Sequence, residues 1–202
     1  MQLIGRTMSP FVRRVAATLN LYGYAYENLP FATATQGAEI ARFNPVGRVP
    51  ALVTDTGETI VDSAAIIDWL DHQVGAARAL TPLAGPDRFV VTKCLALALG
   101  AVEKAVQATY EQDRRPADKV WPENVEKLLS QARGGFEALE AQLTGEWLVL
   151  GRMTQADVTT AISLDAAERF NKAAYADRLP KLKALRDRLN AMPEIGSTGF
   201  KD

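Results

Sequence analysis

Apolar residues recur with different spacings in the two halves of the chain. Up to residue 76, short apolar runs typical of strands alternate with segments of helical spacing. The hairpin residues Asp55 and Gly57 separate the last two runs, so these two strands should pair antiparallel. The first half therefore predicts an α/β domain over residues 1–76 with the order βαβ–α–ββα. Strands are predicted over 2–5, 25–29, 51–54 and 59–61, and helices over 10–22, over the weakly periodic 36–43, and from Ser63 onward.

Glycine and proline cluster around residues 77–86, which we interpret as a linker. Beyond the linker the strand signal disappears, and apolar residues recur at steps of three and four. This pattern predicts an all-α domain over residues 87–202, whose first two helices pack as an antiparallel hairpin. Helices are predicted over 87–110, 122–143, 154–166 and near 176–190, with Pro193 closing the last one.

Residues 154–157, Thr-Gln-Ala-Asp, form a capping-box-like start for the third of these helices. In such a motif the Thr154 hydroxyl accepts a hydrogen bond from the Asp157 amide, and the carboxylate accepts one from the Thr154 amide. We therefore expect this pair to fix the beginning of the helix.

The charge balance excludes several classes of partner. The 202 residues include 23 Lys and Arg against 24 Asp and Glu, with no block of like charge. Neither nucleic acid nor an anionic membrane surface is expected, whereas a small molecule or another protein is. No apolar run reaches the roughly 20 residues of a membrane span and no signal peptide is recognisable, so we expect a cytoplasmic protein. The single Cys94 and single His72 predict neither an internal disulfide nor a metal site.

Candidate chemistry begins at residues 7–13, Thr-Met-Ser-Pro-Phe-Val-Arg, between the first strand and the first helix. Ser9 lies where the helix should start, and Pro10 suits the first helical position. The unpaired amides and the dipole at this end favour negative charge, so an anion placed against Ser9 is stabilised. A serine before a helix is also typical of a simple N-cap, and this motif alone does not separate the two interpretations.

Two further segments carry candidate binding groups. A cis bond between Val49 and Pro50 would leave the Val49 amide and carbonyl as a free strand edge, to which an extended peptide can add. A plain junction between turn and strand is the alternative. At the next helix start, the Ser63 hydroxyl and nearby amides suit a carboxylate and Asp62 suits an ammonium, although for this pair alone a helix cap is the favoured interpretation.

Taken together and in this order, the three segments resemble those of the glutathione transferase family. The matching pieces are residues 9–13, 44–52 and 62–63, and the resemblance extends through the whole chain because residues 154–157 are similar to the family's helical-domain cap. The Ser-Pro-Phe form is most similar to bacterial and plant-type members that use serine. The resemblance implies a thioredoxin-like glutathione-binding domain followed by an all-α domain.

The resemblance also implies how glutathione is held. The Val49 backbone beside Pro50 would pair with the cysteinyl part, Asp62 and Ser63 would hold the γ-glutamyl end, and Arg48 would reach the glycine carboxylate. Ser9 would be the catalytic residue, because its hydroxyl can donate a hydrogen bond to sulfur and so lower the pKa of the thiol.

The activity implied is conjugation of the glutathione thiolate to a small hydrophobic electrophile, with glutathione as substrate and no other cofactor. The co-substrate pocket is expected between the two halves, lined by Met8, Phe11, Tyr110 and Arg114, although ordinary helix surface is the alternative for the last two. Members of the family usually pair, so a homodimer is expected.

Two other classes of function remain as alternatives. A glutathione-dependent thiol oxidoreductase is disfavoured, because Ser9 and Val12 occupy the positions of the usual cysteines and Cys94 lies in an apolar helical face. A non-catalytic module that binds glutathione or another protein would keep the same motifs, because binding does not require turnover.

Overall fold

The computed structural model describes residues 1–175 and 178–199, which fold into two compact units. The first unit comprises Met1–Leu83 together with 189–199, and the second comprises 84–175 and 178–188. The division between Leu83 and Ala84 falls within the predicted linker. Residues 189–199 pack with the first unit, whereas the sequence analysis assigned 87–202 to the second domain.

A four-stranded sheet forms the centre of the first unit, with the strand order β2-β1-β3-β4. Strand β1 pairs in parallel with β2 and antiparallel with β3, and β3 pairs antiparallel with β4, as the hairpin residues predicted. With the helices described below, the order βαβ–α–ββα is confirmed. The strands are β1 (Gln2–Ile4), β2 (Glu27–Leu29), β3 (Ala51–Val53) and β4 (Thr59–Val61).

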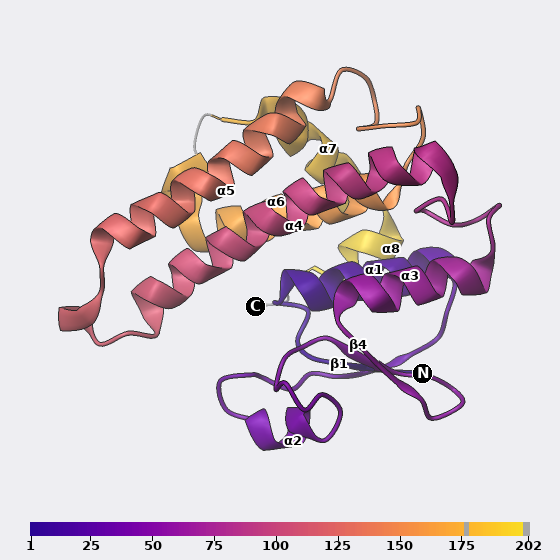
Figure 1. The fold of residues 1–202 in the computed structure, drawn as a ribbon, viewed down its shortest axis with the longest axis horizontal. Coiled ribbons are helices and arrows are strands. Elements are labelled where there is room, and N and C mark those ends of the chain that lie inside the picture. The colour runs from indigo at the N-terminus through magenta and orange to yellow at the C-terminus, as the bar shows by residue number, and fades with distance from the viewer. Residues whose placement is uncertain (176–177, 200–202) are drawn as a thin grey trace. The chain divides into compact units, whose positions relative to one another are not determined.

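Helices cover both faces of this sheet. Helices α1 (Pro10–Tyr22) and α3 (Ser63–Val74) lie side by side on one face, and the short α2 (Gly37–Ala41) lies on the other (Figure 1). On the α2 side, Ile40 packs with Ile4 and Ala51 in a cluster in which all three are fully buried. Helix α1 is buried without interruption from Val12 to Leu19.

A buried polar network joins the ends of α1 and α3 to the segment that leaves the first unit. The Tyr22 hydroxyl donates to the Asp71 carboxylate and accepts from the Leu80 amide at 2.8 Å. Arg78 donates to the Tyr22 carbonyl at 2.9 Å. Burial raises the pKa of Asp71 and that of Tyr22. The network fixes residues 78–80 onto the first unit.

The second unit is helical, with α4 (Gly85–Asp113), η1 (Ala117–Lys119), α5 (Pro122–Gln142), α6 (Gln155–Tyr175) and most of α7 (Pro180–Asn190). Helices α4 and α5 pack as the predicted antiparallel pair. Cys94 contacts Gln142 near one end, and Ala108 packs with Val125 near the other. Midway, a Cβ on Gly135 would lie 2.9 Å from that of Ala101, so glycine permits the close approach. No helix within the described residues is long and apolar enough to cross a membrane.

The start of α6 is fixed by Thr154 and Asp157 in a manner that only partly matches the expected capping box. The Asp157 carboxylate accepts from the Thr154 amide at 2.8 Å, as predicted. The Thr154 hydroxyl, however, donates to the same carboxylate at 2.8 Å and does not accept from the Asp157 amide. The second carboxylate oxygen accepts from the Leu148 amide at 2.8 Å. The Thr154 hydroxyl also accepts from the Ala156 amide at 3.3 Å, so both side chains hold the start of the helix.

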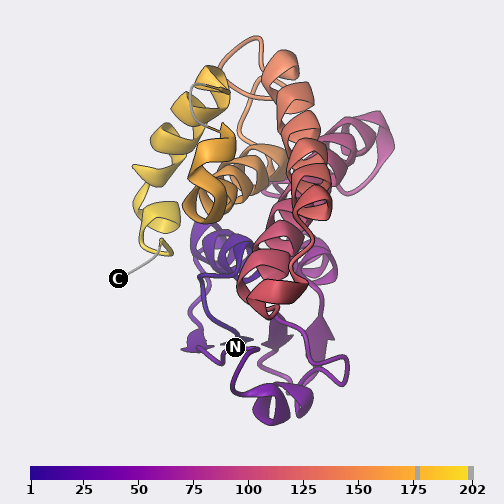
Figure 2. The same cartoon turned by 90° about the vertical axis from the view of Figure 1, so that its left-hand side faces the viewer.

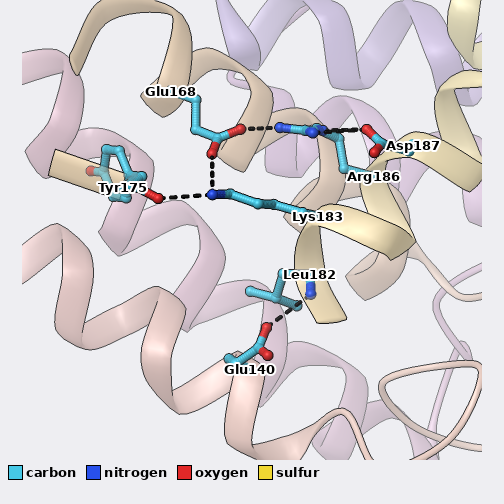
Figure 3. A network of polar contacts seen from close by, with 7 residues as sticks. All are labelled: Glu140, Glu168, Tyr175, Leu182, Lys183, Arg186 and Asp187. Carbon is cyan, nitrogen blue, oxygen red and sulfur yellow. Dashed lines mark hydrogen bonds and ion pairs between the residues drawn. The ribbon is translucent and has the colours of Figure 1, made fainter. Parts of the chain in front are cut away.

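Helix α7 starts against the side chain of Glu140 in α5. One carboxylate oxygen accepts from the Lys181 amide at 3.0 Å. The other accepts from the Leu182 amide at 2.8 Å (Figure 3). An anion at a helix N-terminus satisfies unpaired amides and is favoured by the dipole. Ala176, near which the sequence predicted this helix to begin, lies outside the described residues.

An ion-pair network joins α6 to α7. Glu168 pairs with Lys183 at 3.2 Å and also with Arg186, and all three side chains are largely buried (Figure 3). Lys183 also donates to the Tyr175 carbonyl at 2.9 Å. These contacts hold α6 against α7.

Pro193 does not simply close α7 but occupies the first turn of a further short helix, α8 (Pro193–Gly196). Helix α8 lies beside α1, in yellow next to indigo in Figure 2. Proline fits this position because the amide it lacks has no intrahelical partner there.

Glu140→Ala is expected to lower the free energy of unfolding by about 1–2 kcal/mol, because two amides at the start of α7 lose their acceptor. Thermal unfolding followed by circular dichroism measures the change. Glu137→Ala is the matched control in the same helix, because Glu137 forms an exposed ion pair with Arg178 at 2.8 Å. That variant should change stability by no more than about 0.5 kcal/mol. Equal losses in the two variants would contradict the capping role.

Candidate functional site

Ser9 lies at the N-terminus of α1, and its hydroxyl has no hydrogen-bond partner among the described residues. The residue has the extended backbone of an N-cap, φ −73° and ψ 123°, but its side chain makes no hydrogen bond to the helix amides. Its carbonyl accepts from the Arg13 amide at 2.9 Å, which closes the first helical turn. Pro10 follows, and no acidic residue lies in that turn. The half-buried hydroxyl thus faces a positive helix end and remains available to a ligand.

Gly5 brings the end of β1 close to two other parts of the first unit. A Cβ at this position would lie 2.7 Å from the Val12 side chain and 2.8 Å from that of Val49, and φ is 121°. Neither the space nor the backbone conformation accommodates another residue without displacement. The glycine therefore lets the strand, α1 and the loop before β3 meet next to Ser9.

The loop before β3 is shaped by the side chain of Asn44, which is only 4% exposed. Its amide nitrogen donates to the Arg48 carbonyl at 2.8 Å, and its oxygen accepts from the Val46 amide at 3.0 Å. Gly47 takes a φ of 69° within this loop, and its amide donates to the Asn44 carbonyl at 2.8 Å. The amide nitrogen and the oxygen of the Asn44 side chain therefore both hold the loop of residues 44–48 in shape.

The peptide bond between Val49 and Pro50 is cis, which is one of the two interpretations that the sequence allowed. Within residues 1–175 and 178–199, neither the amide nor the carbonyl of Val49 has a hydrogen-bond partner. Arg48 beside it extends into solvent. This stretch of backbone has the donor and acceptor that an added peptide strand requires.

Asp62 and Ser63 form the start of α3, and the structure assigns the cap to Asp62. The Asp62 carboxylate accepts from the Ala64 amide at 2.7 Å, and Ser63 is the first helical residue. Asp62 has a φ of 73°, which is rare for a residue other than glycine and costs about 1–3 kcal/mol. Ser63 is buried, and its hydroxyl has no hydrogen-bond partner in the described part of the chain. The role of this pair in binding stays a prediction.

The residues expected to line a co-substrate pocket fall into two pairs. Met8, 43% exposed, and the half-buried Phe11 belong to the first unit. Tyr110, 42% exposed, and Arg114 belong to the second, where the guanidinium carbon lies 3.5 Å from the centre of the Tyr110 ring. The aromatic ring and the cation therefore form one surface feature at the end of α4. A pocket shared by the two pairs stays a prediction.

Cys94 is a buried residue of α4, as expected for a small core side chain. Its sulfur accepts from the Gln142 amide nitrogen at 3.1 Å, and burial raises the pKa of the thiol. A thiol of this kind is a poor nucleophile. Within the described residues, no three His, Cys, Asp or Glu side chains are placed to hold a metal ion.

Two buried arginines of α1, Arg13 and Arg14, were not predicted as part of the site. Each is 2% exposed. Burial lowers the pKa of Arg14 to about 10, whereas the charges of Asp62 and Asp71 favour its charged form. Two adjacent arginines on a helix are ordinarily solvated, so the sequence offers no signal of their burial.

Comparisons with known proteins identify the fold and the family. Residues 3–78 match the glutathione S-transferase N-terminal domain, and residues 101–197 match the glutathione S-transferase C-terminal domain. The structure is similar to that of a glutathione transferase family member from Pseudomonas fluorescens Pf-5 with bound glutathione. The TM-score is 0.87 at 25% sequence identity, and the match covers 100% of this chain and 99% of that one.

Two curated relatives extend the match over most of the sequence. The chain is 30% identical over 167 residues to the uncharacterized GST-like protein YibF of Escherichia coli K12, covering 81% of this chain and 80% of that protein. It is 30% identical over 190 residues to maleylacetoacetate isomerase of Pseudomonas aeruginosa, covering 89% and 86%. The chain therefore belongs to the glutathione S-transferase family. The family and the fold class predicted from the sequence are confirmed.

Asn44→Ala is expected to lower the free energy of unfolding by about 1–2 kcal/mol, because two partly buried backbone groups lose their partner. Asn44→Asp keeps the acceptor for the Val46 amide but loses the donor to the Arg48 carbonyl, and should fall between Asn44→Ala and the native protein. Urea unfolding measures all three. Asn124→Ala is the control, because that half-buried side chain makes no hydrogen bond within the described residues. Equal losses for Asn44→Ala and Asn124→Ala would contradict the structural role of Asn44.

Proposed function

We propose that this protein is a glutathione transferase that binds glutathione on its first unit and activates the thiol through Ser9. The observation that carries the proposal is the uncommitted Ser9 hydroxyl at the positive end of α1. A serine that acted only as a cap would bond to an amide of its own helix. The product is the conjugate of glutathione with a small hydrophobic electrophile.

Unused polar groups in the first unit support glutathione as the ligand. The free amide and carbonyl of Val49 suit the cysteinyl residue, since a peptide can bond to both. The buried Ser63 hydroxyl and the α3 amides suit the γ-glutamyl carboxylate, and Asp62 suits the ammonium. The exposed Arg48 provides a cation for the glycine carboxylate. The similar protein from Pseudomonas fluorescens holds glutathione in its crystal structure.

The chemical task of the site is to keep glutathione as a thiolate at neutral pH. A free thiol has a pKa of about 8.5, so only a few per cent is ionised at pH 7. Ser9 does not act as a base, but its hydroxyl donates to the sulfur and the helix end adds favourable potential. Lowering the pKa by about two units favours the thiolate by roughly 2.7 kcal/mol, which makes it the major form.

Isomerisation is a second candidate reaction, favoured by the 30% identity to a maleylacetoacetate isomerase over 89% of the chain. A thiolate that adds to a conjugated double bond forms a carbon–sulfur bond and leaves a single bond free to rotate. Elimination then restores the double bond and releases the thiolate. Conjugation consumes one glutathione for each product, whereas isomerisation consumes none, so measuring free thiol during turnover separates the two.

The non-catalytic alternative predicts that the protein binds glutathione and turns over neither kind of substrate. Retention on immobilised glutathione, combined with assays of several electrophiles and one conjugated cis-alkene, distinguishes it from both reactions. The homodimer expected of a family member also stays a prediction.

Ser63→Ala is expected to weaken glutathione binding with little change in stability. Losing a hydrogen bond to a charged group costs about 1.5–3 kcal/mol, which corresponds to roughly 10- to 100-fold in affinity. Because the cap belongs to Asp62, the melting temperature should remain close to that of the native protein. Isothermal titration calorimetry and thermal unfolding measure the two effects. An unchanged dissociation constant would mean that the γ-glutamyl end is held elsewhere.

Ser9→Ala is expected to raise the pKa of bound glutathione and to lower the conjugation rate at pH 7 by about tenfold or more. Affinity should change much less, because the peptide contacts lie elsewhere. The defect should shrink at high pH, where the thiol ionises unaided. The thiolate absorbance of the bound ligand, titrated against pH, measures the effect directly.

Ser130→Ala serves as the control for this experiment, because it removes an exposed serine hydroxyl from the middle of α5. Its titration curve should match that of the native protein. Superimposable curves for the native protein and Ser9→Ala would remove Ser9 from the mechanism. Ser9→Cys adds an independent check, because a thiol at this helix end should form a mixed disulfide with bound glutathione.

A further inference from the structure

The first unit is built from both ends of the chain, because residues 189–199 return to pack against α1. Helix α8 lies along α1 (Figure 2), and Ile195 within it is fully buried. We call residues 189–199 the C-terminal strap.

One attachment of the strap to α1 is through the buried guanidinium of Arg13. Arg13 donates to the Asn190 side-chain oxygen at 2.8 Å and to the Thr198 hydroxyl at 3.4 Å. The Thr198 hydroxyl in turn donates to the Ile195 carbonyl at 2.6 Å. Burying a charged group without such partners costs several kcal/mol. The strap and the buried position of Arg13 therefore depend on each other.

A second attachment lies at the opposite end of α1. The Asn20 side chain donates to the Glu194 carbonyl at 2.8 Å and to the Ser197 hydroxyl at 3.4 Å. Asn20 lies eleven residues from Ser9, which is about 16 Å along a helix. Arg13, by contrast, lies one turn from Ser9, and its amide donates to the Ser9 carbonyl at 2.9 Å. One residue is thus bonded to Ser9 through its backbone and to the strap through its side chain.

We propose that the C-terminal strap positions the Ser9 hydroxyl, with Arg13 as the positioning residue. The strap bonds hold the guanidinium, the guanidinium holds the first turn of α1, and that turn sets where the hydroxyl meets the ligand sulfur. The inference rests on the proposed role of Ser9. It predicts that cutting the Arg13 attachment changes the ionisation of bound glutathione, and that cutting the Asn20 attachment does not.

The test compares Asn190→Ala with Asn20→Ala in the full chain. Each variant removes one asparagine side chain that attaches the strap to α1. In Asn190→Ala the Arg13 amide should exchange its hydrogen about tenfold faster in the free protein, because the first turn opens more often. The pKa of bound glutathione should rise by about half a unit, with conjugation at pH 7 falling about 1.5-fold, because the thiolate is the major form in the native protein. Asn190→Asp, whose carboxylate still accepts from Arg13, should restore both values.

Each outcome decides between the strap and the role of Ser9. An unchanged exchange rate of the Arg13 amide in Asn190→Ala would overturn the inference, whatever the activity. So would faster exchange with an unchanged thiol titration, or equal titration shifts in the two asparagine variants. If Ser9→Ala alone shifts the titration, the inference fails and the proposed function stands. If Ser9→Ala also leaves it unchanged, the proposed function fails, and the exchange rates still report whether the strap holds the first turn.

Discussion

The burial of helix α1 is the constraint on which the candidate site depends. The residues from Val12 to Leu19 are buried without interruption, and this run includes Arg13 and Arg14. A helix enclosed in this way cannot tilt or slide without displacing the sheet and α3, so the position of its N-terminus is fixed. Ser9 is thus held at a helix end that is both positive and immobile. Preorganised donors of this kind cost little reorganisation when charge develops on the ligand.

Enclosing two arginines in the interior carries a free-energy cost, which the fold offsets in two ways. Arg13 is satisfied by direct hydrogen bonds to the C-terminal strap. Arg14 relies on the charges of Asp62 and Asp71, and its Nε and Nη1 atoms have no hydrogen-bond partner within the described residues. The hydrogen bonds of Arg13 require residues 189–199 to pack against α1, so residues 1–83 alone do not form the whole first unit. The charges around Arg14 connect α1 electrostatically to both ends of α3.

Local patterns predicted the elements well, because helices and strands follow from residues close in sequence. The apolar spacing gave α1 as Pro10–Tyr22, which are its bounds in the structure, and the order βαβ–α–ββα was also correct. The cis bond before Pro50 was anticipated as well. Hydrophobic periodicity and turn residues carry this information without reference to distant contacts.

Features set by distant residues could not be predicted in the same way. Arg13 and Asn190 are 177 residues apart, and nothing near either one marks the pairing. The close approach at Gly5 depends on Val49, which lies in another segment. The bond from the Leu148 amide to Asp157 also lies outside the four-residue motif that predicted the start of α6. Sequence reasoning identified the candidate groups of the site, whereas the way in which the fold holds them required the structure.

The groups left unused in the first unit give the strongest physical argument for a ligand there. Polar groups without a protein partner are available to a ligand, and strained backbone persists only where its surroundings impose it. Here the Ser9 and Ser63 hydroxyls and the Val49 backbone have no partners within the described residues, while Asp62 keeps a rare conformation. Asn44 and Gly5, in contrast, are closely fitted to their neighbours. The residues that support the site, Asn44 and Gly5, are thus held by their neighbours. The Ser9, Ser63 and Val49 groups proposed to contact a peptide-like thiol have no partner in the described part of the chain. This division is expected of a site formed before its ligand arrives, since a preformed site binds without first paying to order itself.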